Sequence, residues 1–254
     1  MNEPDPARHE ETHFGYQRVP VEEKSRRVGE VFSSVASRYD VMNDLMSAGL
    51  HRLWKRQALR LINARPGQRV LDLAAGTGDL AEGMARQVGP SGRVIVSDIN
   101  QAMLETGRDR LLNEGVTGNL DYVIADAERL PFPSRCFDRI SIGFGLRNVT
   151  RIPAALRAMR KALRPGGQVV ILEFSSLYLR PLQPVYDLYS FRVLPLMGHF
   201  VAQDADSYRY LAESIRQHPD QETLKAMMET AGFEDVDYIN LSGGVVAIHH
   251  GHVY

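Results

Sequence analysis

The chain has 254 residues, of which 44% are hydrophobic and 24% are charged, and its formal net charge is −1. This composition is ordinary for a globular domain, and the near-neutral charge argues against a nucleic-acid partner bound through a positive field. The single cysteine, Cys136, excludes an intramolecular disulfide and favours a reducing compartment. No run approaches the roughly 20 apolar residues of a membrane-spanning helix, and the polar N-terminus lacks a signal-peptide core. We therefore expect a cytoplasmic protein, with peripheral contact to the inner face of a membrane left open.

The first quarter of the chain is expected to precede the main fold. Residues 1–24 carry Pro, Glu, His and Arg with little apolar periodicity, which predicts a flexible extension. Apolar residues then recur at helical spacing over residues 28–62, until a Pro-Gly pair ends this part. We expect residues 25–65 to form a helical cap within a single domain that spans residues 25–254.

Strands and helices alternate through the middle of the chain. Helices are expected at 79–88, at 101–113 and around the apolar series Ile152, Leu156, Met159 and Leu163, and strands at 69–74, 93–98, 120–125, 137–144 and 168–174. This order predicts a doubly wound α/β fold, in which helices cover both faces of a mostly parallel, Rossmann-like sheet.

The C-terminal part has a different pattern. Residues 181–216 are rich in Tyr, Phe, Leu and Met and predict a helical insert on the substrate side. A further helix is expected to start at Pro219-Asp220. The strands expected at 234–241 and 245–250 flank a Gly-Gly turn, which predicts a closing antiparallel hairpin.

A glycine-rich turn follows the first of these parallel strands. In the stretch VLDLAAGTGDLA, Gly76 and Gly78 flank Thr77 and allow the backbone to approach a ligand at the start of a helix. The turn also fits the permissive G-x-G-x-x-G/A pattern, and Asp98 lies 20 residues beyond Gly78. Taken alone, this motif is also compatible with an NAD-dependent oxidoreductase.

Acidic residues near the ends of three strands favour a different nucleotide. Asp72 precedes the glycine turn, where a carboxylate opposes a pyrophosphate but suits the positive charges of S-adenosylmethionine. Asp98 is placed to bind ribose hydroxyls, and Asp126, which precedes Ala127, is placed to accept a hydrogen bond from an adenine amino group. Because ligands of open α/β sheets lie outside the carboxyl ends of the strands, the three acids are expected to surround one site.

Further motifs resemble those of a known family. VFSSVASRYDVMNDLMSAGLHRLWK (31–55) and LRPGGQVVILEF (163–174) look like its two signatures, and VLDLAAGTGD, FGLRNVT, DADSYRYLAESI and HPDQETLKAMM also match. The chain thus resembles the ubiquinone/menaquinone biosynthesis C-methyltransferases (UbiE/MenG type), which are class I S-adenosylmethionine-dependent methyltransferases. The resemblance covers nearly everything after residue 25.

This resemblance implies methyl transfer from S-adenosylmethionine to a ring carbon of a prenylated quinol. The acceptor would be a 2-polyprenyl-6-methoxy-1,4-benzoquinol, demethylmenaquinol or both. The family's cofactor-contacting positions map to Thr77, Asp98, Asp126 and Ala127. Many members have Ser where this chain has Gly143, so a side-chain contact to the cofactor is lost here or replaced by backbone or water.

The predicted catalytic set is Arg147, Asn148 and Tyr39. Arg147 is expected to hydrogen-bond the quinol oxygen and stabilise phenolate charge, with Asn148 orienting the same group. The alternative is an ion pair that ties the Arg147 loop to an acid such as Asp126. The general base is left open among Tyr39, Asp40, Asp44, His51, Asp204 and Asp206.

Several questions about partners stay open at this level. The apolar residues between Pro181 and Gln203 either line a channel for the prenyl tail, touch lipid or pack as core. His249, His250 and His252 end an edge strand, so no metal is expected. A non-catalytic member of a quinone-biosynthesis complex is the alternative from another functional class. The oligomeric state is not determined, with a homodimer among the options.

Overall fold

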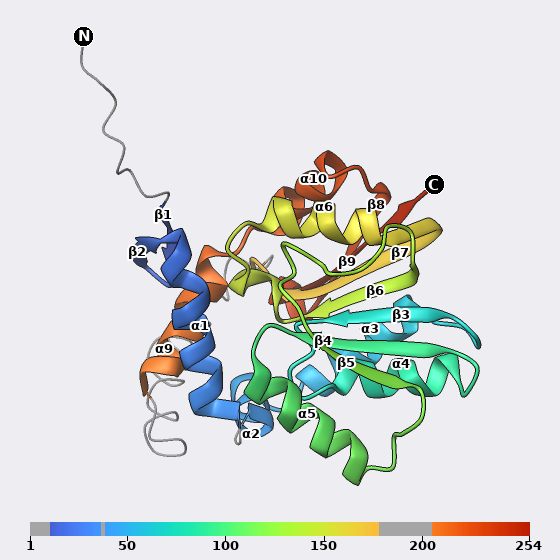
Figure 1. The fold of residues 1–254 in the computed structure, drawn as a ribbon. Coiled ribbons are helices and arrows are strands. Elements are labelled where there is room, and N and C mark those ends of the chain that lie inside the picture. Colours follow the sequence, from blue (N-terminus) through green and yellow to red (C-terminus); the bar gives the residue numbers. More distant parts are fainter. Residues whose placement is uncertain (1–10, 37–38, 178–204) are drawn as a thin grey trace.

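The computed structural model describes residues 11–36, 39–177 and 205–254. Its sheet is formed by β3 (Arg69–Leu73), β4 (Arg93–Asp98), β5 (Leu120–Ile124), β6 (Phe137–Gly143), β7 (Leu163–Phe174), β8 (Glu234–Leu241) and β9 (Val246–Val253). The strand order is β5-β4-β3-β6-β7-β9-β8 (Figure 1). Strands β3 to β7 pair in parallel, and β9 is antiparallel to both β7 and β8. The expected α/β fold and closing hairpin are confirmed.

Helices cover both faces of this sheet. One face carries α3 (His51–Ile62), α4 (Asp79–Val88) and α5 (Gln101–Asn113), and the other carries α6 (Ile152–Ala162) and α10 (Gln221–Thr230) (Figure 1). The central strands are buried on both faces, which explains their nearly continuous apolar runs. Each helix turns one apolar side inward: Ala155, Leu156 and Met159 of α6 are fully buried.

The remaining helices lie at the end of the sheet where the parallel strands finish. They are α1 (Val21–Val35), α2 (Tyr39–Ser47) and α9 (Ala205–Gln217), and α1 and α9 lie side by side at the left of Figure 1. The helical character expected for residues 28–62 is found in three helices, α1, α2 and α3. None of the helices in the described ranges has the length and apolar character that a bilayer crossing requires.

The flexible extension expected for residues 1–24 is wrong from residue 11 onward. Residues Glu11–Phe14 and Gln17–Pro20 form an antiparallel hairpin, β1 and β2, and α1 starts at Val21. The hairpin is held by stacking of Phe14 on Tyr210 of α9, with ring centroids 4.3 Å apart. Strands β1 and β2 have four residues each, which is too short to show the alternation of apolar and polar residues that predicts a strand. The hairpin was therefore not predicted from the sequence.

Two further boundaries differ from expectation. Strand β7 begins at Leu163, before the Pro-Gly-Gly segment, and its register against β6 shifts between Phe137 and Arg139. Strand β9 continues to Val253, beyond the expected end at residue 250. The expected insert at 181–216 lies outside the described residues up to residue 204, and its last part forms α9. The proposed division into cap, domain and insert stays a prediction.

Candidate active site

A cavity of about 380 Å³ lies at the carboxyl ends of the parallel strands. This is the place where open α/β sheets bind ligands, and the volume falls in the usual range of small-molecule sites. Its walls come from the ends of β3 and β4, the segments after β5 and β6, and one side of α1, and they include Gly76, Asp98, Asp126, Ala127, Phe144, Asn148, Val28 and Phe32. Helix α1 therefore forms a wall of the site rather than a separate appendage.

The glycine turn after β3 has the conformation that its sequence predicts. Gly76 and Gly78 have φ values of 55° and 84°, which side-chain-bearing residues seldom adopt, and Gly78 is the N-cap of α4. Gly76 lines the cavity. The backbone N–H of Gly76 donates to Asp98 Oδ2 over 2.9 Å, so the end of β4 fixes the turn.

Asp98 has the geometry of a ribose-binding carboxylate. Its Oδ1 accepts from the N–H of Asn100 over 2.9 Å, and its Oδ2 accepts from Gly76, so each oxygen retains acceptor capacity. Burial raises the pKa of this carboxyl, and hydrogen bonds from the backbone N–H groups of Asn100, Gly76 and Ile99 oppose that effect. A carboxylate anchored in this way, in the wall of a cavity, can accept from two neighbouring hydroxyl groups of a nucleoside.

Asp126 and Ala127 lie where the sequence predicted an adenine contact. Both line the cavity beside the end of β5, and Asp126 is exposed toward it. Asp126 Oδ1 accepts from the N–H of Glu128 over 2.9 Å, which fixes the direction of the carboxylate. The arrangement supports the predicted role of Asp126, which stays a prediction.

Asp72 lies deeper than the sequence suggested. It is 1% exposed, its Oδ1 accepts from Ser141 over 2.7 Å, and its Oδ2 has no hydrogen-bond partner among the described residues. It lines a small inner cavity of about 20 Å³ together with Lys55, Thr77 and Gly143. That space holds one water-sized group, and it shares Ala74 with the main cavity. The unpartnered oxygen suits the ammonium end of S-adenosylmethionine.

The burial of Asp72 makes the stability of the folded chain depend on pH. It raises the pKa of this carboxyl to about 7, although the hydrogen bond from Ser141 opposes the shift. The folded chain therefore binds this proton more tightly than the unfolded chain, and between about pH 4 and 7 the stability falls as the pH rises. We expect Asp72→Asn to remove this part of the pH dependence. In the unaltered chain it amounts to a fall of roughly 2–4 kcal/mol in the free energy of unfolding between about pH 4 and 7.

Urea unfolding of the unliganded protein at several pH values measures the effect. Asp121→Asn is the matched control, because Asp121 is an exposed acid of β5 outside both cavities. Parallel stability curves for Asp72→Asn and the unaltered chain would show that Asp72 is not protonated in the folded state.

Gly143 leaves little room for the serine that many family members carry. A Cβ added there would lie 2.8 Å from Leu80 Cδ1, so a larger residue requires that flexible side chain to move. Gly143 lines the inner cavity beside Asp72. The chain thus provides no side-chain contact at this position.

Arg147 occupies a different place from the one predicted. It is buried with Glu173 of β7: Arg147 Nη1 lies 2.8 Å from Glu173 Oε1, and its backbone N–H donates to Glu173 Oε2 over 3.2 Å. Nη1 also donates to the carbonyl of Phe144. Arg147 does not line the main cavity. The ion-pair alternative is therefore realised, but with Glu173 rather than with Asp126.

Asn148, unlike Arg147, lines the main cavity. It belongs to the short 3₁₀ turn η2 (Leu146–Asn148), and its Oδ1 accepts from the hydroxyl of Tyr210 over 2.9 Å. With Oδ1 engaged in this way, the side-chain amide is left to donate to an acceptor in the cavity. The Arg147–Glu173 pair holds the turn that presents Asn148.

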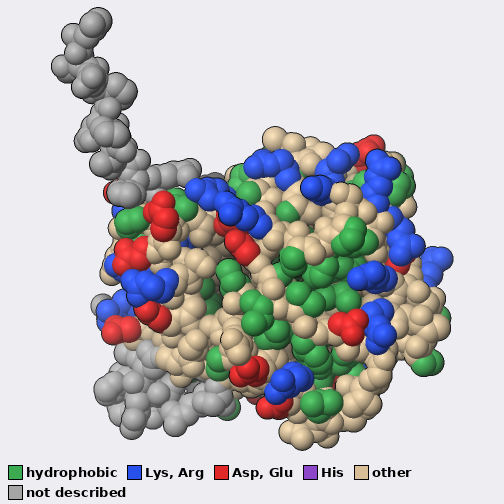
Figure 2. Space-filling model, viewed as in Figure 1, with side chains coloured by type: hydrophobic (Ala, Val, Ile, Leu, Met, Phe, Trp, Pro, Cys, Tyr) green, Lys and Arg blue, Asp and Glu red, His purple; other side chains and the backbone are tan. Residues whose placement is uncertain are grey.

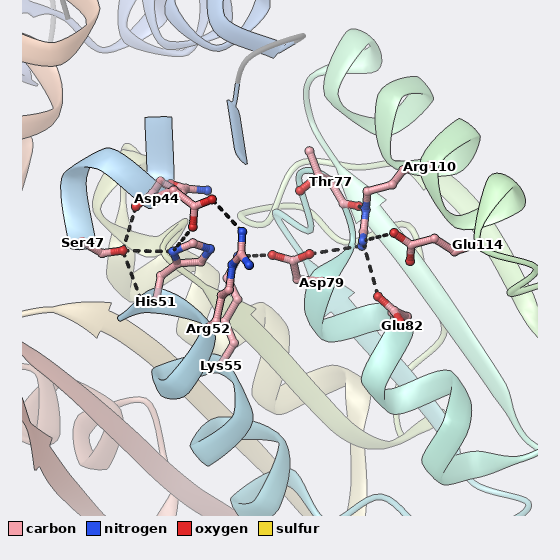
Figure 3. Close-up of polar contacts among 11 residues, drawn as sticks. Asp44, Ser47, His51, Arg52, Lys55, Thr77, Asp79, Glu82, Arg110 and Glu114 are labelled. Atoms are coloured by element: carbon pink, nitrogen blue, oxygen red, sulfur yellow. Dashed lines mark hydrogen bonds and ion pairs between the residues drawn. The ribbon is translucent and has the colours of Figure 1, made fainter. Parts of the chain in front are cut away.

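Sequence reasoning missed two lysines near the site. Lys24 of α1 donates from Nζ to the carbonyl of Val149 over 3.1 Å, and burial lowers its pKa to about 8. Lys55 of α3 pairs with Asp79 at the start of α4, and Asp79 also pairs with Arg110 of α5 (Figure 3). Both lysines lie on amphipathic helices. In a sequence, a lysine at such a position is normally assigned to the side of the helix that faces solvent, so neither was considered as part of the site.

The candidate general bases whose side chains the structure describes, Asp44, His51 and Asp206, do not line the main cavity. His51 contacts Ser47 Oγ over 2.9 Å and lies 3.7 Å from Asp44, within the network of Figure 3, and burial lowers its pKa. Asp206 is exposed and pairs with Arg209. The side chains of Tyr39 and Asp40, and the whole of Asp204, lie outside the described part of the chain. The catalytic role of Tyr39 stays a prediction.

The three C-terminal histidines do not form one cluster. His249 contacts the carbonyl of Gln221 through Nε2 over 2.9 Å. His250 and His252 lie on the opposite face of β9, because successive side chains of a strand alternate between its faces, and the centroids of these two rings are 6.2 Å apart. Within the described ranges, no group of three His, Cys, Asp or Glu side chains is placed to bind a metal.

Solved structures with the same fold have low sequence identity to this chain. A SAM-dependent methyltransferase from Aquifex aeolicus matches with a TM-score of 0.58 and 15% identity, covering 85% of this chain and 98% of that one. A putative methyltransferase from Haloferax volcanii, solved with its Trm112 activator, gives 0.65 and 15%, covering 89% and 97%. Both likenesses show that the chain has the fold of the class I, S-adenosylmethionine-dependent methyltransferases.

Sequence comparison identifies the family within this class. The model of the ubiE/COQ5 methyltransferase family matches residues 20–253. The ubiquinone/menaquinone biosynthesis C-methyltransferase UbiE of Pseudomonas paraeruginosa is 59% identical over 240 residues, which cover 94% of each chain. Its namesake from Escherichia fergusonii is 60% identical over 245 residues, covering 96% of this chain and 98% of the relative. The chain belongs to the ubiE/COQ5 methyltransferase family.

Proposed function

We propose that this enzyme transfers the methyl group of S-adenosylmethionine to a ring carbon of a prenylated quinol in ubiquinone and menaquinone biosynthesis. The acceptor is a 2-polyprenyl-6-methoxy-1,4-benzoquinol, demethylmenaquinol or both. The observation that carries the proposal is the cavity formed by the glycine turn, Asp98 and Asn148 in a chain about 60% identical to relatives named for this reaction.

The methyl donor supplies an already activated methyl group. The protein therefore has to bind the donor and the acceptor, orient them toward each other and exclude water from the site. Asp98 is proposed to accept from the ribose hydroxyls, Asp126 and Ala127 to contact the adenine, and Asp72 to accept from the ammonium group. Gly76, Thr77 and Gly78 shape the turn beside the donor. The buried position of Asp72 and the anchored carboxylate of Asp98 both support this binding mode.

At the acceptor side, Asn148 is proposed to donate to a quinol oxygen, which would stabilise the charge that develops on it. This role is supported by its place in the cavity wall and by the Tyr210 hydroxyl that occupies its Oδ1. Arg147 is proposed to position Asn148 through Glu173 rather than to touch the quinol, in place of the direct contact predicted from the sequence.

The decisive experiment incubates the protein with isotopically labelled S-adenosylmethionine and each reduced acceptor in turn, followed by mass analysis of the methylated position. Methyl transfer to a ring carbon of a quinol is the expected result. Cofactor binding without transfer to any quinol would instead favour a non-catalytic partner in a biosynthetic complex. The fold alone does not decide between these outcomes, because a [4+2]-cyclase, SpnF, shares it with a TM-score of 0.65 and 16% identity.

A further inference from the structure

A strongly basic surface lies outside the active site, on the side of the sheet covered by α6. Residues 151–164 contain five cations and no acid, and the segment 129–135 adds Arg129 and Arg135. This concentration contrasts with the formal net charge of −1 for the whole chain. On the side seen in Figure 2, Lys and Arg side chains gather over α6, and hydrophobic side chains lie directly beside them.

The cations surround a groove of about 520 Å³, here called the basic groove. Ser134, Arg135, Arg157, Arg160, Lys161 and Tyr254 are among its lining residues. Arg151 and Arg164 are paired with Glu128 and Asp138. Within the described part of the chain, by contrast, no ion pair involves any of the four cations of the basic groove. The groove therefore presents uncompensated positive charge.

Helix stability alone does not account for this arrangement. Arg160 and Lys161 lie in the last turn of α6, where cations stabilise the helix dipole. Arg157 lies one turn earlier, and Arg135 comes from the loop before β6. Arg160 also donates from Nε to the carbonyl of Gly232, a structural contact. Arg157 and Lys161 are exposed and make no comparable contact within the described residues.

A second groove joins the basic groove to the active site. This linking groove, of about 360 Å³, has an apolar floor of Leu130, Phe132, Ala154 and Ala158. It shares Arg157 and Lys161 with the basic groove and Glu128 and Arg129 with the active-site cavity. An apolar path with a cationic border thus leads to the place where the acceptor is methylated.

We infer that the basic groove and the linking groove together form a docking surface for a bilayer that contains anionic phospholipids. The inference rests on the proposed function, because a quinol with a prenyl tail resides in the bilayer. Lipid phosphates match the unpaired cations, and the apolar floor allows the acceptor to approach the cavity without exposing its tail to water. An acidic protein partner would match the charges but would not explain an apolar path into the cavity.

Vesicle co-sedimentation of the full chain tests the surface. We expect binding to vesicles of phosphatidylglycerol and phosphatidylcholine in equal parts, release at high salt, and little binding to phosphatidylcholine alone. The variant Arg157→Glu/Lys161→Glu should lose binding about 30-fold or more, since each cation near an anionic surface contributes roughly a factor of five. Arg56→Glu/Arg60→Glu makes the same charge change at exposed positions of α3, on the opposite side of the sheet, and should bind nearly as well as the unaltered chain.

Equal binding to both vesicle types, equal losses in the two variants, or no binding at all would overturn the docking surface. Turnover of a tail-less quinol in vesicle-free buffer should be the same in both variants and the unaltered chain, because neither substitution touches the cavity. A complete absence of methyl transfer to every quinol would contradict the proposed function instead, and the vesicle result would still decide the docking surface.

Discussion

Replacement of Asp98 by alanine is expected to weaken binding of S-adenosylhomocysteine, the stable product analogue, by at least about 100-fold. Each hydrogen bond to a charged acceptor contributes roughly 1.5–3 kcal/mol, and two ribose hydroxyls are proposed to donate here. The substitution also removes the acceptor that holds the N–H of Gly76, so the glycine turn loses its fixed position. Isothermal titration calorimetry measures the change in dissociation constant.

Two further variants separate charge from shape. Asp98→Asn keeps the size of the side chain and one acceptor oxygen, but its amide group opposes the N–H of either Gly76 or Asn100. We therefore expect an affinity between those of the unaltered chain and Asp98→Ala. Asp121→Ala removes an exposed acid of β5 outside the cavity and should leave affinity unchanged. A dissociation constant for Asp98→Ala within a fewfold of the unaltered value would remove Asp98 from the cofactor site.

The acids proposed for the cofactor site could be placed at one edge of the sheet from sequence, because each lies at or after the end of a strand with a clear apolar pattern. Asp98 ends β4 and Asp126 follows β5, so the topology of a parallel sheet brings both to one edge. The pattern places residues along the chain but does not say how deeply they lie. Asp72 was assigned to the same site, yet it lies beneath the turn, in the inner cavity with Lys55.

Long-range pairing is what the sequence could not supply. The partner of Arg147 is Glu173, 26 residues further along and on the neighbouring strand β7. Glu173 occurs in the family signature as a single acid at the end of an apolar strand, and nothing local indicates that it faces Arg147. The prediction therefore left open a ligand contact or an ion pair with an acid such as Asp126, and it did not name Glu173.

Loss of the Glu173 carboxylate is expected to have the largest effect on stability. Glu173→Gln leaves the guanidinium of Arg147 buried without a counter-charge, and breaking a buried ion pair in this way typically costs about 3–5 kcal/mol. Glu173 is 1% exposed and Arg147 8% exposed, so water cannot easily replace the lost partner. The free energy of unfolding in urea measures the loss.

A double substitution distinguishes a structural from a catalytic role for Arg147. Arg147→Met/Glu173→Gln removes both charges and keeps one side-chain acceptor, which can serve the backbone N–H of residue 147 or that of Phe174 but not both. We expect it to be more stable than Glu173→Gln, because no unpaired charge remains buried. If Arg147 only positions Asn148, the double variant should retain cofactor affinity and lose less than about 100-fold in turnover at a temperature where it is folded, because only the position of Asn148 is disturbed. A loss of turnover of about 100-fold or more, with affinity intact, would show that the guanidinium takes part in the methyl transfer itself.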